Sequence, residues 1–308
     1  MRVAVSGATG LIGSALVRVL RERGDIAVAL ARDADAARAK LGEGVELHTW
    51  ATPDTAPPPA EALAGADGVV HLLGEPIDQR WTEDAKRRIR DSRVHSTTLL
   101  ADALVALPDG ERPPVLVSQS ATGYYGARGD EPVDEDAPAG EDFLASVVTE
   151  WEQAARRAEP SLRVVCTRTG VVLAADGGAL AKMLPFFRLG IGGPVAGGRQ
   201  YVPWIHLDDV VGGLLSCLDD ERLSGAVNLT APQPVTNAEL SRVLGRVLRR
   251  PAFLPVPGFA LKLLYGEMAQ VVLEGNRAVP AGLEAAGHAF AHPQLEPALR
   301  AALGRANS

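Results

Sequence analysis

Short apolar runs alternate with helical patterns through the first half of the chain. The runs lie at residues 3–5, 26–31, 45–47, 67–73, 115–117 and 162–167, with a later one at 227–229. Between the first two runs, apolar side chains recur at helical spacing from Ile12 to Leu20, and Gly24 ends that pattern. Strands that alternate with helices are typical of a parallel sheet with helices packed on it, so we predict a doubly wound α/β fold.

Two longer helices are predicted in the same half. Thr82 is a suitable N-cap for a helix that carries Glu83 and Asp84 in its first turn and runs toward Leu107. A second helix is predicted over residues 142–158. Both fit the alternation of strands and helices.

Three glycines spaced three apart follow the first apolar run. Gly7 lets the chain turn out of the strand, Gly10 leaves room for a pyrophosphate beside the backbone, and Gly13 lets the next helix pack closely on the strand. Free N–H groups at the start of that helix can bind phosphate. Because a strand precedes the glycines and a helix follows them, they predict the dinucleotide-binding turn of a Rossmann-type domain. A tight turn without a ligand is the alternative.

The pattern changes after residue 172. A glycine-rich stretch contains an amphipathic piece at 179–188, and Asp208 or Asp209 can cap a helix over 210–218. The remainder is helical and interrupted by prolines. We therefore predict that residues 1–172 and 201–230 form the Rossmann domain, while residues 173–200 and 231–308 form a smaller, mainly helical substrate or cap domain.

Composition narrows the class of protein. The chain has 308 residues, of which 46% are hydrophobic, and a net charge of -7. That charge argues against nucleic acid and anionic membranes as partners. Cys166 and Cys217 lie in apolar runs without metal-ligating neighbours, which predicts buried free thiols, and no metal site is expected. The first residues enter a strand directly and no apolar run approaches the roughly 20 residues that span a bilayer, so we expect a cytoplasmic protein.

The end of the second predicted strand bears on the cofactor. An acidic residue there binds the ribose 2′-hydroxyl of NAD, whereas an arginine accommodates the 2′-phosphate of NADP. Arg32 comes first and Asp33 second. We therefore predict NADP(H) rather than NAD(H), with Arg32 as the phosphate ligand. The alternative is that Arg32 is an ordinary surface residue.

The glycine turn, the strand that ends at Gly74, the segment 118–126 and the segment 204–209 together resemble the extended short-chain dehydrogenase/reductase superfamily, of the NAD-dependent epimerase/dehydratase type. Five short segments further resemble its atypical "epimerase family protein" branch, which has a C-terminal domain of unknown function. They are residues 74–77, 80–82, 89–93, 254–257 and 266–268. The resemblance implies an NAD(P)-binding Rossmann domain and a substrate-binding C-terminal lobe. The expected cofactor-binding residues are Gly7, Thr9, Gly10, Leu11, Ile12, Gly13, Arg32, Leu72, Gly74, Glu75, Arg93 and Ser118.

The catalytic residues depart from that superfamily. Ordinary members use a tyrosine, a lysine four residues later, and a serine that binds the reacting oxygen. Ser120 matches the serine, and Ser118 and Thr122 are neighbours that could replace it. The helix matching the Tyr-x-x-x-Lys segment, residues 142–151, contains neither a tyrosine nor a lysine.

Other residues could supply the missing proton. Tyr124 or Tyr125 could do so if Arg93, which stands where an asparagine is usual, lowered the phenol pKa. Packing against substrate or cofactor is the alternative for both tyrosines. His71 lies in an apolar strand and is expected to be a core histidine, and His206 is expected to orient Asp209 at a strand-to-helix junction.

Two functions remain open from the sequence. One is an NADP-dependent oxidoreductase or epimerase that acts on a small polar substrate. The other is an NADP(H)-binding sensor or interaction protein without hydride chemistry, which the missing Tyr-Lys pair favours. A homodimer is possible through the two long helices, as in related proteins, although the apolar side chains Leu144, Val147 and Trp151 could equally pack in the chain's own core.

Overall fold

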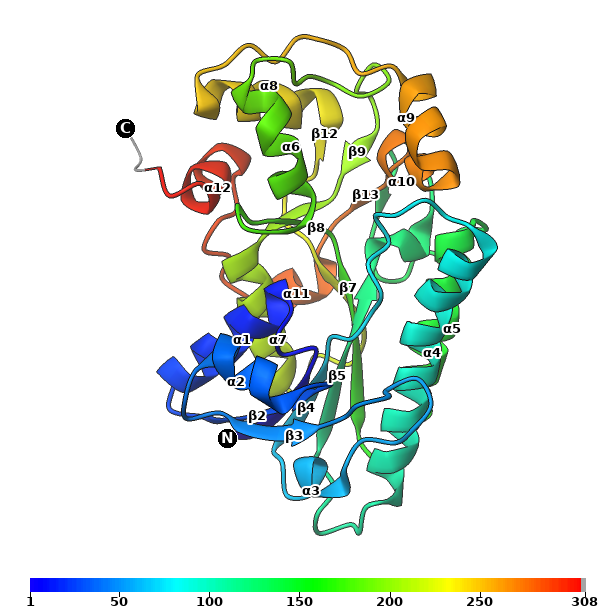
Figure 1. Ribbon diagram of the computed structural model, residues 1–308, viewed down its shortest axis with the longest axis vertical. Coiled ribbons are helices and arrows are strands. Elements are labelled where there is room, and N and C mark those ends of the chain that lie inside the picture. Colours follow the sequence, from blue (N-terminus) through cyan, green and yellow to red (C-terminus); the bar gives the residue numbers. More distant parts are fainter. Residues whose placement is uncertain (306–308) are drawn as a thin grey trace.

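The computed structural model describes residues 1–305. Its centre is a seven-stranded sheet of order β11-β7-β5-β4-β1-β2-β3, in which all neighbours are parallel. The strands are β1 (Arg2–Ser6), β2 (Ile26–Ala31), β3 (Glu46–Thr49), β4 (Gly68–His71), β5 (Val115–Ala121), β7 (Arg163–Thr169) and β11 (Gly225–Leu229). The strand order reverses between β1 and β4, where ligands bind in such sheets. The predicted Rossmann-type fold class is confirmed (Figure 1).

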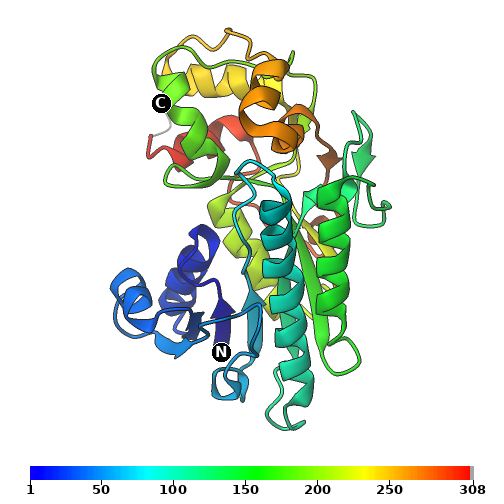
Figure 2. The ribbon, with the colours of Figure 1, turned by 45° about the vertical axis from the view of Figure 1, so that its right-hand side comes forward.

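Helices cover both faces of this sheet (Figures 1 and 2). One face carries α1 (Leu11–Glu22), α2 (Ala34–Leu41) and α7 (Leu207–Asp219), and the other carries α3 (Ala60–Leu63), α4 (Glu83–Ala106) and α5 (Phe143–Arg156). Val3 and Val5 of β1 pack toward α1, whereas Ala4 between them packs toward α4, as the period of two in a strand requires. Within residues 1–305, no helix is long and apolar enough to cross a membrane.

A second lobe lies above the C-terminal ends of the strands (Figure 1). Its core joins α6 (Gly178–Arg188), α8 (Asn237–Leu248) and α12 (Leu295–Ala302). Short strand pairs connect the lobe: β8 (Val171–Leu173) with β10 (Trp204–His206), β9 (Tyr201–Val202) with β12 (Val235–Thr236), and β6 (Pro132–Val133) with β13 (Arg277–Ala278). Between α8 and β13, the chain forms α9 (Gly258–Tyr265), a 3₁₀ turn (Gly266–Ala269) and α10 (Gln270–Leu273).

Several details differ from the sequence expectations. β5 continues to Ala121, so Ser118 and Ser120 belong to a buried strand and not to a loop after it. The helix α7 is capped by His206, not by Asp208 or Asp209, because the His206 ring accepts a hydrogen bond from the Asp208 N–H. The short helix α11 (Ala281–Ala285) crosses back to the Rossmann sheet and buries Leu283 beside β11. The proposed domain boundaries otherwise stay a prediction.

Candidate functional site

The glycine turn has the geometry that a dinucleotide needs. Gly7 adopts a φ of +68°, in the left-handed region that favours glycine. A Cβ added at Gly13 would lie 2.2 Å from the carbonyl oxygen of Gly7, so only glycine fits there. Gly10 is the exposed N-cap of α1 and supplies no side chain that would bond the first N–H groups of the helix. Those groups are therefore free for phosphate oxygens.

Other predicted cofactor residues flank this turn. Thr9, Leu11 and Ile12 are partly buried, and Leu11 packs against Gly177 from the second lobe. Leu72, directly after β4, has its carbonyl oxygen 2.7 Å from the position of a Cβ on Gly7. The ends of β1 and β4 therefore meet at the glycine turn, as a nucleotide site between them requires.

Arg32 and Asp33, the two residues after β2, have different surroundings. The carboxylate of Asp33 accepts a hydrogen bond from the Ala36 N–H (3.0 Å) and so caps α2. Arg32 is exposed, and it forms no hydrogen bond or ion pair with the other residues described by the structure. The basic group is thus exposed at the strand end, while Oδ1 of the acidic group caps α2.

Arg93 lies beside the segment that follows β4. Its guanidinium packs 3.1 Å from the position of a Cβ on Gly74 and donates to the carbonyl of Glu75 (3.0 Å). Burial lowers the pKa of Arg93 to about 10, so it stays charged at neutral pH. The ring of Trp151 lies 5.2 Å from the guanidinium carbon. Arg93 therefore shapes the loop at Gly74 and Glu75, which are both predicted cofactor residues.

Ser120 is bound to a charged partner that the sequence analysis missed. Its hydroxyl donates to Glu152 Oε1 (2.7 Å), and both residues are buried. Arg168 of β7 donates to both oxygens of the same carboxylate, from Nε (2.8 Å) and Nη2 (2.9 Å). Ser118 is fully buried, and its hydroxyl has no hydrogen-bond partner among residues 1–305.

A sequence signal for this ion pair existed. Glu152 follows Trp151 on the apolar stripe of α5, and Arg168 lies in β7 directly after the apolar run 162–167. Charged residues at positions that a pattern assigns to the core are paired in folded proteins. The partner of each residue could not be read from the sequence.

The two tyrosines differ in their surroundings. Tyr125 is fully buried; its hydroxyl donates to Asn228 Oδ1 (2.7 Å) and accepts from Arg168 Nη1 (3.1 Å). Burial raises the pKa of Tyr125 to about 12. These contacts give Tyr125 a structural role in the core and favour neither proton transfer nor packing against substrate or cofactor.

Tyr124 is half-buried and stacks on Arg168, whose guanidinium carbon lies 3.4 Å from the ring centroid. The cation beside both tyrosines is therefore Arg168, and the expectation that Arg93 occupies this place is wrong. Arg93 is held instead at Glu75 and Ile89.

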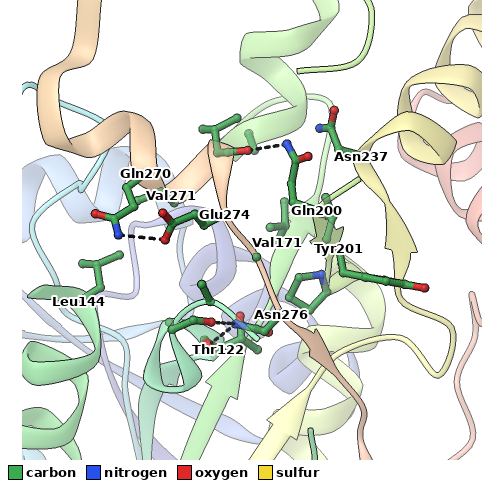
Figure 3. Close-up of a pocket in the computed structure, with 18 of the residues that line it drawn as sticks. Thr122, Leu144, Val171, Gln200, Tyr201, Asn237, Gln270, Val271, Glu274 and Asn276 are labelled. Carbon is green, nitrogen blue, oxygen red and sulfur yellow. Dashed lines mark hydrogen bonds between the residues drawn. The ribbon is translucent and has the colours of Figure 1, made fainter. Parts of the chain in front are cut away.

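A cavity of about 250 Å³ lies between the sheet and the second lobe (Figure 3). Thr122 and Gly123, just after β5, form its floor together with Leu144 of α5 and Val171 of β8. The second lobe contributes Tyr201, Leu240, Gln270, Val271, Val272, Glu274 and Asn276. Of the three candidate hydroxyls at the end of β5, Thr122 lines this cavity, whereas Ser118 and Ser120 do not.

The histidines outside this cavity have structural partners. His71 lies between the hydroxyls of Ser6 (2.6 Å) and Ser96 (3.3 Å), and burial lowers its pKa to about 3, so the predicted core histidine is confirmed. His206 does not orient Asp209, which instead accepts the N–H groups of Ala291 and His292.

His206, Asp208 and His292 place three potential metal-ligating atoms within 4.8 Å of one another. The Asp208 carboxylate lies 3.5 Å from His206 Nδ1 and 3.2 Å from His292 Nε2. His206 Nδ1 accepts the Asp208 N–H as the cap of α7, while its buried Nε2 has no hydrogen-bond partner among residues 1–305.

The remaining predictions concern burial and assembly. Cys166 and Cys217 are buried free thiols, as predicted. Val147 and Trp151 of α5 are buried within the chain, and Trp151 donates to Thr97 Oγ1 (2.9 Å). The apolar face of α5 is thus largely taken up by the chain's own core, and the homodimer stays a prediction.

Two family models match the chain. Residues 3–229 match the NAD dependent epimerase/dehydratase family, and residues 256–302 match a domain of unknown function, DUF1731. The chain is 42% identical over 308 residues to the Arabidopsis thaliana "Epimerase family protein SDR39U1 homolog, chloroplastic", covering 98% of this chain and 86% of the relative.

Two solved structures extend the comparison. The human epimerase family protein SDR39U1 with NADPH is 36% identical, with a TM-score of 0.89 over 99% of this chain and all of the human chain. A nucleoside-diphosphate sugar epimerase from Corynebacterium glutamicum is 32% identical, with a TM-score of 0.76 over 99% of this chain and 58% of that protein. Because the plant relative is described as chloroplastic, a cytoplasmic location stays an expectation.

Proposed function

The chain belongs to the NAD dependent epimerase/dehydratase family, and from this premise we propose that it binds NADP(H) and exchanges a hydride with a small molecule in the cavity above β5. When bound, the cofactor supplies or accepts a hydride at its nicotinamide ring. Gly7, Gly10 and Gly13 would hold its pyrophosphate, and Arg32 its 2′-phosphate. The human relative solved with NADPH supports the choice of this cofactor.

The observation that carries the proposal is the cavity itself. It lies at the C-terminal end of β5, next to the strand ends that lead into the glycine turn, and the second lobe forms its other side. A protein that only binds a nucleotide needs no such apolar cavity beside it. In this proposal the Thr122 hydroxyl hydrogen-bonds the reacting oxygen, since Ser120 is bonded to Glu152.

Hydride exchange is tested by following NADPH absorbance with a panel of carbonyl compounds. We expect turnover by the wild type and a loss of roughly 10²-fold in kcat for Thr122→Val, because one hydrogen bond to the reacting oxygen is removed. Thr122→Ser should keep most of the activity. Thr149→Val is the matched control, because the Thr149 hydroxyl bonds the Ala145 carbonyl within α5. Equal rates for Thr122→Val and wild type would contradict the assignment of Thr122.

A second function is favoured by one observation. The helix α5 has neither the tyrosine nor the lysine of ordinary members, and the hydroxyl of Ser120 is bonded to Glu152. A protein that binds NADP(H) and signals its occupancy would need neither residue. Stoichiometric NADPH binding with no turnover across the panel would favour this function over hydride exchange.

Cofactor preference gives a separate prediction. Arg32→Ala should weaken NADPH binding by about tenfold or more, because hydrogen bonds to charged groups contribute about 1.5–3 kcal/mol, and should leave NADH binding unchanged. Calorimetric titration of both cofactors measures this. Arg38→Ala is the control, since Arg38 is an exposed residue of α2 paired with Glu43. Tighter binding of NADH than NADPH by the wild type would refute the preference.

A further inference from the structure

The walls of the cavity above β5 are mainly apolar. Leu144, Val171 and Leu240 line it, and Trp81 and Phe143 form an aromatic pair in the wall, with ring centroids 5.1 Å apart. Val271 and Val272 of α10 contribute further apolar surface even though both are exposed. Such a lining gains little from a hydrated, polar ligand and favours hydrocarbon surface. The expectation of a small polar substrate does not match these walls.

The charges of the cavity also select against an anion. Its charged lining residues are Asp142 and Glu274, and among residues 1–305 no lysine or arginine lines it. Two lysines lie beside lining residues of the cavity, and both form ion pairs. Lys182 of α6 pairs with Asp78. Lys86 lies over the Phe143 ring and pairs with Glu267. Arg277 stacks on Tyr201, a lining residue, and has no ion-pair partner among residues 1–305, but it does not itself line the cavity. On the lining itself, a diphosphate would therefore meet carboxylates and no cation.

One buried polar group in the wall has no partner. Asn276 is 5% exposed, and its Nδ2 donates to the carbonyls of Thr122 (2.9 Å) and Gly126 (3.2 Å), as Figure 3 shows for the first of these. Because both contacts are acceptors, the amide nitrogen must face them, which fixes the orientation of the side chain. Asn276 Oδ1 is then a buried acceptor without a hydrogen-bond partner among residues 1–305. A water molecule or a ligand that brings a donor would satisfy such a group.

The cavity volume of about 250 Å³ lies just below the roughly 300–1,000 Å³ that ligand pockets usually span, which fits a compact ligand.

We infer that this cavity takes an uncharged, mainly apolar molecule of one or two rings that carries a hydroxyl or N–H donor for Asn276 Oδ1, and that it does not take nucleoside diphosphate sugars. The inference rests on the proposed function only in treating this cavity as the substrate site. It separates this chain from the nucleotide-sugar chemistry for which the Corynebacterium glutamicum relative is named. A hydride exchange would convert the hydroxyl of such a ligand to a carbonyl, with the hydride passing to NADP⁺ and the hydroxyl proton to water.

The test compares three probes by calorimetry on the full chain loaded with NADP⁺: 2-tetralol, 2-methoxytetralin and UDP-glucose. We expect 2-tetralol to bind at least tenfold more tightly than UDP-glucose. The methyl ether, which keeps the rings but lacks the donor, should bind about tenfold more weakly than the alcohol, because Asn276 Oδ1 is then left unsatisfied.

A charge introduced into the wall provides the matched variant. Val271→Asp should weaken 2-tetralol binding at least fivefold and leave NADP⁺ binding unchanged, since Val271 lines the cavity and is 41% exposed. Val105→Asp on α4 is the control, because Val105 is 37% exposed and does not line the cavity. Both substitutions are at exposed positions, so folding should tolerate them.

The outcomes separate the inference from the proposed function. Tighter binding of UDP-glucose than of 2-tetralol, or equal binding of the alcohol and its methyl ether, would overturn the inference. Binding of 2-tetralol as expected, without any reduction of NADP⁺, would support the inference and count against hydride exchange. Turnover of UDP-glucose would support hydride exchange and overturn the inference.

Discussion

Glu152→Ala is expected to lower the free energy of unfolding by about 3–5 kcal/mol. The carboxylate of Glu152 is 5% exposed and accepts hydrogen bonds from Ser120 and from two nitrogens of Arg168. Its removal leaves the Arg168 charge buried without a counter-ion, which is among the costliest changes in a protein interior. Burial lowers the pKa of Arg168, and in the wild type the hydrogen bonds and charge of Glu152 raise it above its usual value. Without Glu152 this compensation is lost, and an arginine guanidinium does not escape the cost by losing its proton. Urea unfolding followed by circular dichroism measures the change.

The matched control for this prediction is Asp102→Ala. Asp102 of α4 also pairs with an arginine, Arg157 at the C-terminal end of α5, but both partners of that pair are about half exposed. Exposed pairs of this kind contribute about 0–1 kcal/mol. A double variant, Glu152→Leu with Arg168→Met, should recover part of the lost stability, because no charge remains buried. Similar effects for Glu152→Ala and Asp102→Ala would show that the buried pair is not important for stability.

Gly13→Ala is expected to weaken NADPH binding by about 100-fold, or about 2.8 kcal/mol. The added methyl group would lie 2.2 Å from the Gly7 carbonyl oxygen and 2.8 Å from Ala8 Cα, both of which are backbone atoms. The start of α1 must therefore move away from the turn, which displaces the N–H groups that would bind the pyrophosphate. Overpacking of this kind also costs about 1–3 kcal/mol of stability. Calorimetric titration with NADPH and thermal unfolding measure the two effects.

Gly110→Ala serves as the control for Gly13→Ala. A Cβ at Gly110 meets no atom within 4 Å, and the residue does not adopt a positive φ. Both binding and stability should be unchanged or slightly improved, since alanine reduces the entropy of the unfolded chain. Wild-type NADPH affinity in Gly13→Ala would disprove the role assigned to the glycine turn.

The sequence by itself determined the sheet and the cofactor turn of this protein. Apolar periodicity reports on residues a few positions apart, and it located the parallel strands and the helices between them. The glycine spacing is equally local, because Gly7 and Gly13 meet within one strand-turn-helix unit. Arg32 and Asp33 are adjacent in the sequence, so both candidates for contact with the ribose 2′ position could be identified without the structure.

Only the tertiary structure decided which residues could serve the chemistry. Ser120 contacts Glu152 and Tyr125 contacts Asn228, pairs separated by 32 and 103 positions along the chain. The same long-range packing placed Arg168, not Arg93, beside the tyrosines. It also built the apolar cavity from Leu144 to Asn276, which belong to different lobes. Such contacts depend on how distant segments pack, and a local pattern of hydrophobic and polar residues carries no information about them.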